Sequence, residues 1–151
     1  MASVRVGTHI ERPLEDVFKL FTDIEGAASR VSNIRKIEVL TTGDFSIGTR
    51  WLETREVLGR EQTEELSVTA LEHGHAYTIT TETHGTKFDC TFRFDRALGG
   101  TDVLAEFDVV PQSFGGMLVA PFGWMMMGTV EESLKRDLAD LKAAAEGRAR
   151  A

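Results

Sequence analysis

The chain has 151 residues, 42% of them hydrophobic and 27% charged, a composition typical of one soluble globular domain spanning residues 1–151. Its formal net charge of −7 argues against a nucleic-acid partner, and its single cysteine excludes an intramolecular disulfide and favours a cytoplasmic location. No apolar run approaches the roughly 18 residues that would span a bilayer, so we expect no integral membrane association.

The first part of the chain predicts one strand followed by two helices. Residues 3–10 alternate apolar and polar side chains, which is typical of a half-buried strand. Pro13 is tolerated at a first helical position and acidic residues follow it, so a helix is expected over residues 13–22. Apolar residues continue at helical spacing after it, which predicts a shorter second helix over residues 23–32.

Six further strands are expected between Ile34 and Val110, where the apolar period changes to two. Turns are predicted at Gly59-Arg60, His73-Gly74, His84-Gly85 and Gly99-Gly100. Two-residue loops at the first three turns would place the following residues opposite one another: Trp51 and Val68, Glu53 and Leu66, Arg55 and Glu64, Val68 and Ile79, Ala70 and Tyr77, Thr81 and Phe88, Ile79 and Cys90, and Tyr77 and Phe92. This register gathers most apolar residues on one side, which predicts an antiparallel sheet buried on one face.

One long helix is expected within residues 116–146, and its two halves differ in composition. The back half carries Leu134, Leu138 and Leu141 at ordinary core spacing. The front half gathers glycines, Trp124 and four methionines, and methionine adapts to irregular shapes. This composition suits the lid of an apolar cavity.

The order of elements and two segments resemble a known superfamily over residues 3–146. The segments are Gly48-Thr49-Arg50-Trp51-Leu52-Glu53-Thr54-Arg55-Glu56-Val57-Leu58-Gly59-Arg60 and the ending Trp124-Met125-Met126-Met127-Gly128…Leu138-Ala139-Asp140-Leu141-Lys142. The chain resembles the START-like helix-grip superfamily (SRPBCC), and within it the polyketide cyclase/dehydrase branch. The resemblance implies an α+β fold in which a curved seven-stranded antiparallel sheet grips a long C-terminal helix, with two short helices between the first and second strands. It also implies a cavity for hydrophobic or amphipathic molecules, including lipids. Members include carriers, ligand-gated binders, cyclases and hydratases, so the fold leaves the function open.

Glu53 is the first candidate for chemistry, because the predicted register places it on the apolar face between Trp51 and Arg55. A carboxylate there must be paired or have a raised pKa. One interpretation is a polar anchor or general acid/base in the cavity, and the other is a structural ion pair with Arg55.

Glu131 is the second candidate, because it falls roughly 30° from the centre of the apolar stripe of the long helix. One interpretation places it in the pocket. The other is a surface pair with Lys135, four residues later.

A set of apolar residues on the predicted inner face is expected to line the cavity or to fill the core. With the two glutamates, the candidate ligand-binding residues are Trp51, Glu53, Leu66, Tyr77, Ile79, Phe88, Cys90, Phe92, Phe107, Trp124, Met127 and Glu131. Cys90 is expected to be an inert small hydrophobe, and the Tyr77 hydroxyl would need a hydrogen-bond partner if buried. No spacing typical of a metal site or a phosphate-binding loop occurs, so we expect no metal and no cofactor.

These observations favour binding or transport of a hydrophobic or amphipathic small molecule. The alternative is a polyketide cyclase-like or dehydratase-like enzyme, in which Glu53 or Glu131 abstracts a proton and Arg55 or Tyr77 stabilises the oxyanion. A second alternative is a protein-interaction module that exposes residues 114–128, and self-association as a homodimer through that segment stays open.

Overall fold

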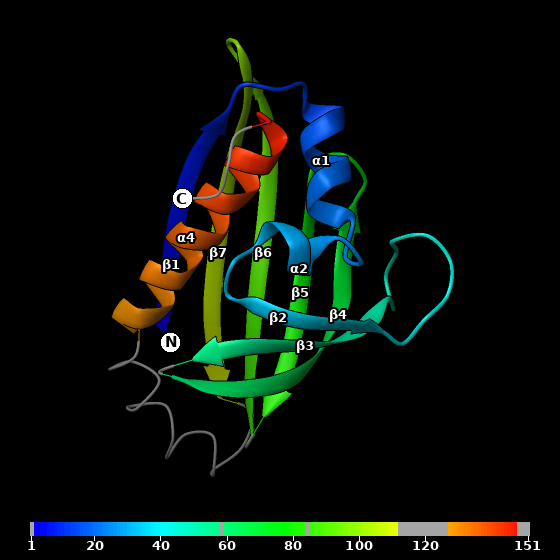
Figure 1. Ribbon diagram of the computed structural model, residues 1–151, viewed down its shortest axis with the longest axis vertical. Helices are drawn as coiled ribbons and strands as arrows, with labels where there is room; N and C mark the ends of the chain where they lie inside the picture. The colour runs from blue at the N-terminus through cyan, green and yellow to red at the C-terminus, as the bar shows by residue number, and fades with distance from the viewer. Residues whose placement is uncertain (1, 58, 84, 112–126, 148–151) are drawn as a thin grey trace.

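The computed structural model describes residues 2–57, 59–83, 85–111 and 127–147. Within them, three helices accompany seven strands, in the order shown in Figure 1. The elements are β1 (Ala2–Ile10), α1 (Leu14–Thr22), α2 (Ala27–Arg30), β2 (Ile34–Val39), β3 (Arg50–Val57), β4 (Arg60–Glu72), β5 (Ala76–Thr83), β6 (Thr86–Ala97), β7 (Gly100–Pro111) and α4 (Met127–Ala145). No helix in this part of the chain is long and apolar enough to cross a membrane.

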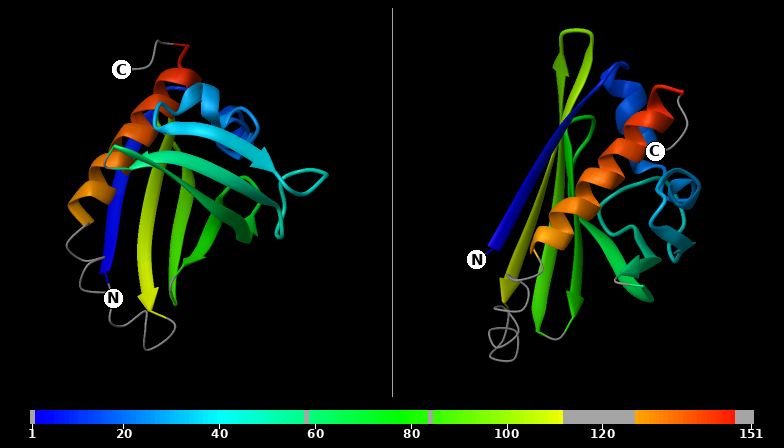
Figure 2. Two further views of the ribbon diagram at one scale, coloured as in Figure 1. Left: turned by 60° about the horizontal axis from the view of Figure 1, so that its bottom comes forward. Right: turned by 60° about the vertical axis from the view of Figure 1, so that its left-hand side comes forward.

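All seven strands form one antiparallel sheet in the order β1-β7-β6-β5-β4-β3-β2. The sheet twists and curls, so β2 and β3 run across the long strands β5–β7 (Figure 1). The two further views show α4 lying along one side of the curved sheet, where it contacts β1, with α1 beside its C-terminal half (Figure 2). This is the α+β helix-grip arrangement that the resemblance implied.

The two early helices follow from local sequence, but the second is shorter than predicted. α1 begins at Leu14, one residue later than predicted, with Pro13 as its N-cap, and ends at Thr22 as predicted; its apolar face is buried. α2 contains only residues 27–30, in place of the predicted 23–32. The reason is competition from Asp23, which leaves helical geometry, pairs with Arg30 at 2.8 Å and accepts the backbone N–H of Gly26.

The predicted strand register is confirmed on the β5–β6 pair, where Tyr77 faces Phe92, Ile79 faces Cys90 and Thr81 faces Phe88. It is wrong by two residues on the β3–β4 pair. Val57 faces Arg60 at this end of the pair and Gly59 has φ +78°, so Trp51 faces Leu66, Glu53 faces Glu64 and Arg55 faces Gln62. A shift of two residues leaves every side chain on its predicted face.

The β4–β5 pair contains a β-bulge that the sequence register missed. Val68 faces Ile79 as predicted, but the register shifts between Val68 and Ala70, and Leu71 takes the place opposite Tyr77 that was predicted for Ala70. The shift turns Leu71 toward the core, where it packs against the buried cluster.

Aromatic side chains fill the end of the sheet that α1 covers. Phe18 and Phe21 from α1 meet Tyr77 and Phe94 from the sheet, with ring centroids between 5.1 and 6.1 Å apart in mostly edge-to-face pairs. Tyr77 is 3% exposed, and its hydroxyl donates to the backbone oxygen of Phe21 at 3.4 Å. This end of the molecule is a packed core.

The middle and C-terminal part of α4 is held by both apolar and polar contacts. Leu134 and Leu138 are buried, as their spacing predicted. Lys142 donates to the backbone oxygen of His9 on β1, and Asp140 accepts from Ser32 just before β2. These contacts determine which face of α4 packs against the sheet.

Candidate functional site

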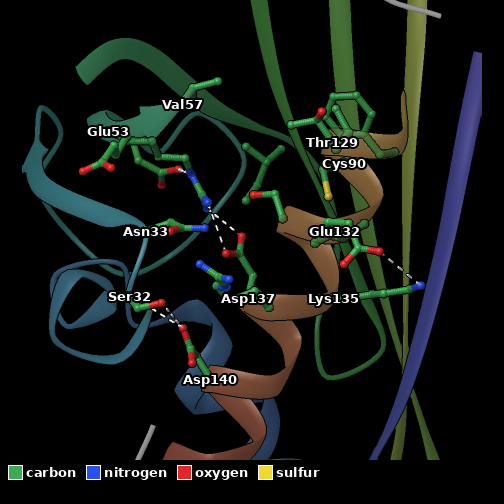
Figure 3. A pocket seen from close by; sticks show the side chains of 18 of the residues that line it. Ser32, Asn33, Glu53, Val57, Cys90, Thr129, Glu132, Lys135, Asp137 and Asp140 are labelled. Atoms are coloured by element: carbon green, nitrogen blue, oxygen red, sulfur yellow. Dashed lines mark hydrogen bonds and ion pairs between the residues drawn. The ribbon is translucent and has the colours of Figure 1, made fainter. Parts of the chain in front are cut away.

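A cavity of about 1170 Å³ lies between the inner face of the sheet, α4 and the segment that precedes β2. Its apolar wall comes from the sheet and consists of Trp51, Leu66, Ile79, Cys90, Phe92 and Phe107. Polar and charged side chains come from β3, from residues 32–33 and from α4. Figure 3 shows Asp137 and Asp140 on α4 pointing toward the segment that carries Ser32 and Asn33.

A largely buried ionic cluster of Glu53, Arg55 and Asp137 forms the polar centre of this cavity. Glu53 and Arg55 point to the same side of β3 because they are two residues apart, and Asp137 reaches them from α4. Arg55 Nε donates to Glu53 Oε2 at 2.6 Å, while its two terminal nitrogens donate to the two oxygens of Asp137 at 3.2 and 2.8 Å. The side chains of Glu53 and Asp137 are each 13% exposed, and that of Arg55 is 27% exposed.

Trp51 completes the cluster, since its indole Nε1–H donates to Glu53 Oε1 at 3.2 Å. Each Glu53 oxygen therefore has a protein donor. The pairing of Glu53 with Arg55 is the one that the structural interpretation of the sequence predicted.

The pKa values of the cluster differ from ordinary values for identifiable reasons. Burial opposes the charge of Arg55, but the attraction of Asp137 and Glu53 outweighs it and raises the pKa of the guanidinium. Burial raises the pKa of Asp137, and Glu53 and Asp140 add to this effect, while Arg55 opposes it. A carboxyl whose charge is disfavoured beside a fixed guanidinium can hold or release a proton, so this arrangement is suited to orienting a polar group or to acid–base chemistry.

Asp140 is a second buried carboxylate in the cavity wall, and its side chain is not exposed. Its Oδ2 accepts the backbone N–H and the hydroxyl of Ser32, both at 2.8 Å. Its Oδ1 has no hydrogen-bond partner within the part of the chain that the structure describes. This oxygen can accept a hydrogen bond that the described protein atoms do not supply.

Cys90 lies in the apolar wall, where burial and the nearby charge of Asp137 raise the pKa of its thiol to about 12. A thiol with such a pKa is a poor nucleophile at neutral pH.

Several of the predicted site residues lie elsewhere. Tyr77 belongs to the packed aromatic core, and Phe88 packs against Phe107 with ring centroids 6.0 Å apart without lining the cavity. Glu131 also does not line it, because it lies at the helix surface, 45% exposed and 3.4 Å from Lys135 Nζ. The pocket position expected for Glu131 is wrong, and the surface pair is confirmed. Trp124 and the Met127 side chain lie outside the described residues.

The sequence interpretation missed Asp137 and Asp140. A signal was present, because Asp137 follows Leu134 by three residues and precedes Leu141 by four, so it neighbours the apolar stripe. Glu131 was selected because it lies close to the centre of the stripe. In the structure the cavity opens beside the other edge of the stripe, where Asp137 and Asp140 lie.

Among the described residues, no group of three or more histidine, cysteine, aspartate or glutamate side chains could hold a metal ion.

Similarities to known structures extend over nearly the whole chain. The Zhui aromatase/cyclase from Streptomyces sp. R1128 superposes with a TM-score of 0.79 at 18% identity, covering 96% of this chain and 93% of its own. A START superfamily protein from Mycobacterium smegmatis gives a TM-score of 0.72 at 15% identity, covering 96% and 97%. A protein from Thermus thermophilus gives 0.72 at 18% identity, covering 97% and 98%. At these identities the likeness shows a shared fold.

No match is found among curated proteins. The model of one family, described as polyketide cyclase/dehydrase and lipid transport, matches residues 1–146. With that match over almost the whole sequence, and with the helix-grip fold described above, this chain belongs to the polyketide cyclase/dehydrase and lipid transport family.

Proposed function

We propose that the protein binds a hydrophobic or amphipathic small molecule in the cavity between the sheet and α4. The observation that carries this proposal is a cavity of about 1170 Å³ with an apolar wall on one side and an ionic cluster on the other. Ligand pockets commonly measure roughly 300 to 1,000 Å³ and combine an apolar lining with a few placed polar groups. A cavity slightly larger than this range suits a lipid or a polycyclic molecule.

The ionic cluster supports an orienting role. Buried ion pairs contribute little net stability, because desolvation of the charges offsets their attraction. Glu53, Arg55 and Asp137 nevertheless line the cavity together. They would place the polar end of a ligand against β3 and α4, while its apolar body contacts Ile79, Phe92 and neighbouring side chains.

Titration with a neutral fluorophore that brightens in apolar surroundings tests this function. The wild-type protein is expected to bind such a probe with a dissociation constant on the order of micromolar. Ile79→Trp places an indole on β5, the central strand of the sheet and part of the cavity wall, and should weaken binding by about tenfold or more.

Ile47→Trp is the matched control, because Ile47 is 64% exposed and does not line the cavity. It introduces the same indole and should leave probe binding unchanged. Equal binding by the wild type and by both variants would contradict the proposal. Urea unfolding of each variant verifies that the fold is retained.

A second candidate is proton-transfer catalysis of the cyclase or dehydratase type. The observation favouring it is Asp137, a largely buried carboxyl whose pKa is raised and which contacts Arg55 inside the cavity. Asp137 would take up a proton adjacent to a substrate carbonyl while Arg55 stabilises the developing oxyanion. The sequence had suggested Glu53 or Glu131 as the base.

The enzyme candidate predicts that Asp137→Asn abolishes turnover of a β-dicarbonyl substrate while ligand affinity stays within about threefold. Turnover that survives in Asp137→Asn would remove Asp137 from this role. Glu53→Gln, measured alongside, tests the carboxylate that the sequence suggested.

A further inference from the structure

We propose that the cavity selects amphiphiles whose polar group is a neutral or cationic hydrogen-bond donor, and that it discriminates against anionic amphiphiles such as fatty-acid carboxylates. This inference rests on the proposed ligand-binding function and specifies the ligand class. It follows from the balance of buried charges and from one buried acceptor without a partner in the described part of the chain.

The ionic cluster already holds more negative than positive charge. Its single guanidinium, on Arg55, is shared by the carboxylates of Glu53 and Asp137. Three of its N–H groups point at carboxylate oxygens, two of them in a bidentate contact with Asp137. Because two carboxylates already offset its charge and use three of its five N–H groups, Arg55 is a poor anchor for a third carboxylate from a ligand.

Asp140 adds a third buried carboxylate to the same cavity. No lysine or arginine among the described residues lies within ion-pair distance of it, and its Oδ1 lacks a donor there. Three carboxylates and one guanidinium leave the buried part of the cavity wall with a formal charge of −2. In a low-dielectric cavity, this charge repels an anion and favours a donor that can reach Asp140.

Two cations at the cavity rim do not change this balance. Lys135 is 53% exposed and lies near Glu131 and Glu132, while Arg136 is exposed. Solvent and salt screen exposed charges of this kind much more than buried ones.

The raised pKa of Asp137 agrees with an excess of negative charge in the cavity. Burial is the main reason that the pKa of Asp137 is raised, and the charges of Glu53 and Asp140 raise it further despite the adjacent guanidinium. An additional carboxylate entering the cavity would meet the same burial and the same repulsion.

Three ten-carbon competitors with different polar groups provide the test, each used to displace the neutral fluorophore at neutral pH. Decanol and decylamine should each displace the probe at concentrations about tenfold or more below that required for decanoate. Salt at about 0.15 M limits the Debye length to about 8 Å, which suppresses the contribution of the overall negative charge.

Asp137→Asn removes one cavity carboxylate and should reduce the decanol-to-decanoate preference by about threefold or more. Asp102→Asn makes the same change in total charge on an exposed side chain of β7, which is 63% exposed and pairs with His9. This control should leave the preference as in the wild type.

Decanoate binding as tightly as decanol to the wild type would overturn the inference and leave the proposed function intact, since the cavity would still take amphiphiles. An unchanged preference in Asp137→Asn would also overturn it, because the selectivity would then not come from the cavity charge. Failure of the probe and all three competitors to bind would overturn the proposed function itself, and this inference with it.

Discussion

Replacing Arg55 with methionine removes the only cation of the Glu53–Arg55–Asp137 cluster and retains most of the apolar volume. Two carboxylates, each only 13% exposed, then lose their shared partner. Breaking a buried ion pair from one side costs roughly 3 to 5 kcal/mol, because the remaining charge is left uncompensated. We expect Arg55→Met to lower the free energy of unfolding by about this amount at neutral pH.

Two further variants distinguish the effect of an uncompensated charge from the effect of lost packing. Asp137→Asn leaves Glu53 and Arg55 as a neutral pair, so its cost should be only about 1 to 2 kcal/mol. Replacing all three residues, as Glu53→Leu, Arg55→Met and Asp137→Leu together, should bring stability back to within about 1 kcal/mol of the wild type. The cluster is then dispensable for folding, in agreement with a role in ligand orientation.

The pH dependence of the Arg55→Met loss follows from the direction of the Asp137 pKa. Folding already raises the pKa of Asp137 above 3.8, so its ionised form costs stability as the pH rises through the folded-state value. Loss of Arg55 raises it further. The destabilisation of Arg55→Met should therefore shrink as the pH falls from neutral to mildly acidic, since Asp137 takes up a proton.

Urea unfolding followed by tryptophan fluorescence measures these free energies, because Trp51 is 1% exposed and contacts the cluster. A loss below about 1 kcal/mol for Arg55→Met at neutral pH would show that Arg55 does not compensate the two carboxylates. So would a larger loss in Asp137→Asn than in Arg55→Met.

Three further predictions concern positions away from the cluster. The Cys90 thiol, with a pKa of about 12, should be alkylated on the order of 100-fold more slowly in the folded protein than in urea, and equal rates measured by mass spectrometry would contradict the raised pKa. Gly100→Ala should lower the free energy of unfolding by about 2 kcal/mol or more, because a Cβ there would lie 2.1 Å from the backbone oxygen of Ile10. Gly99→Ala, at φ +80° in open space, should lower it by only about 1 kcal/mol. A larger loss for Gly99→Ala than for Gly100→Ala in urea unfolding would contradict this. Glu131→Gln should change the free energy of unfolding by less than about 0.5 kcal/mol, and a larger loss would show that its surface pair matters more than its exposure allows.

The sequence predicted the faces of the sheet better than its exact pairings. The error of two residues between β3 and β4 left Glu53 and Arg55 on the correct face, because side chains alternate with a period of two. The bulge between Val68 and Ala70 has no clear local sequence signal, so the inward position of Leu71 was not predicted.

The cavity was harder to predict than the fold, because it depends on how α4 is rotated against the sheet. Helical periodicity identifies the buried stripe of Leu134 and Leu138, but it does not show which edge of the stripe faces open space. Asp137 and Asp140 were missed for this reason. The cytoplasmic location and the lack of a nucleic-acid partner stay predictions.

The most direct test of the central claim is native mass spectrometry of freshly purified wild-type protein beside the Ile79→Trp variant, followed by solvent extraction of whatever is released. We expect a discrete bound mass in the wild type that is lost on unfolding and depleted in Ile79→Trp, with an amphiphilic molecule in the extract. Ligand-free masses for both proteins, even after incubation with mixed lipids and aromatic polyketides, would contradict the claim that the cavity is a binding site.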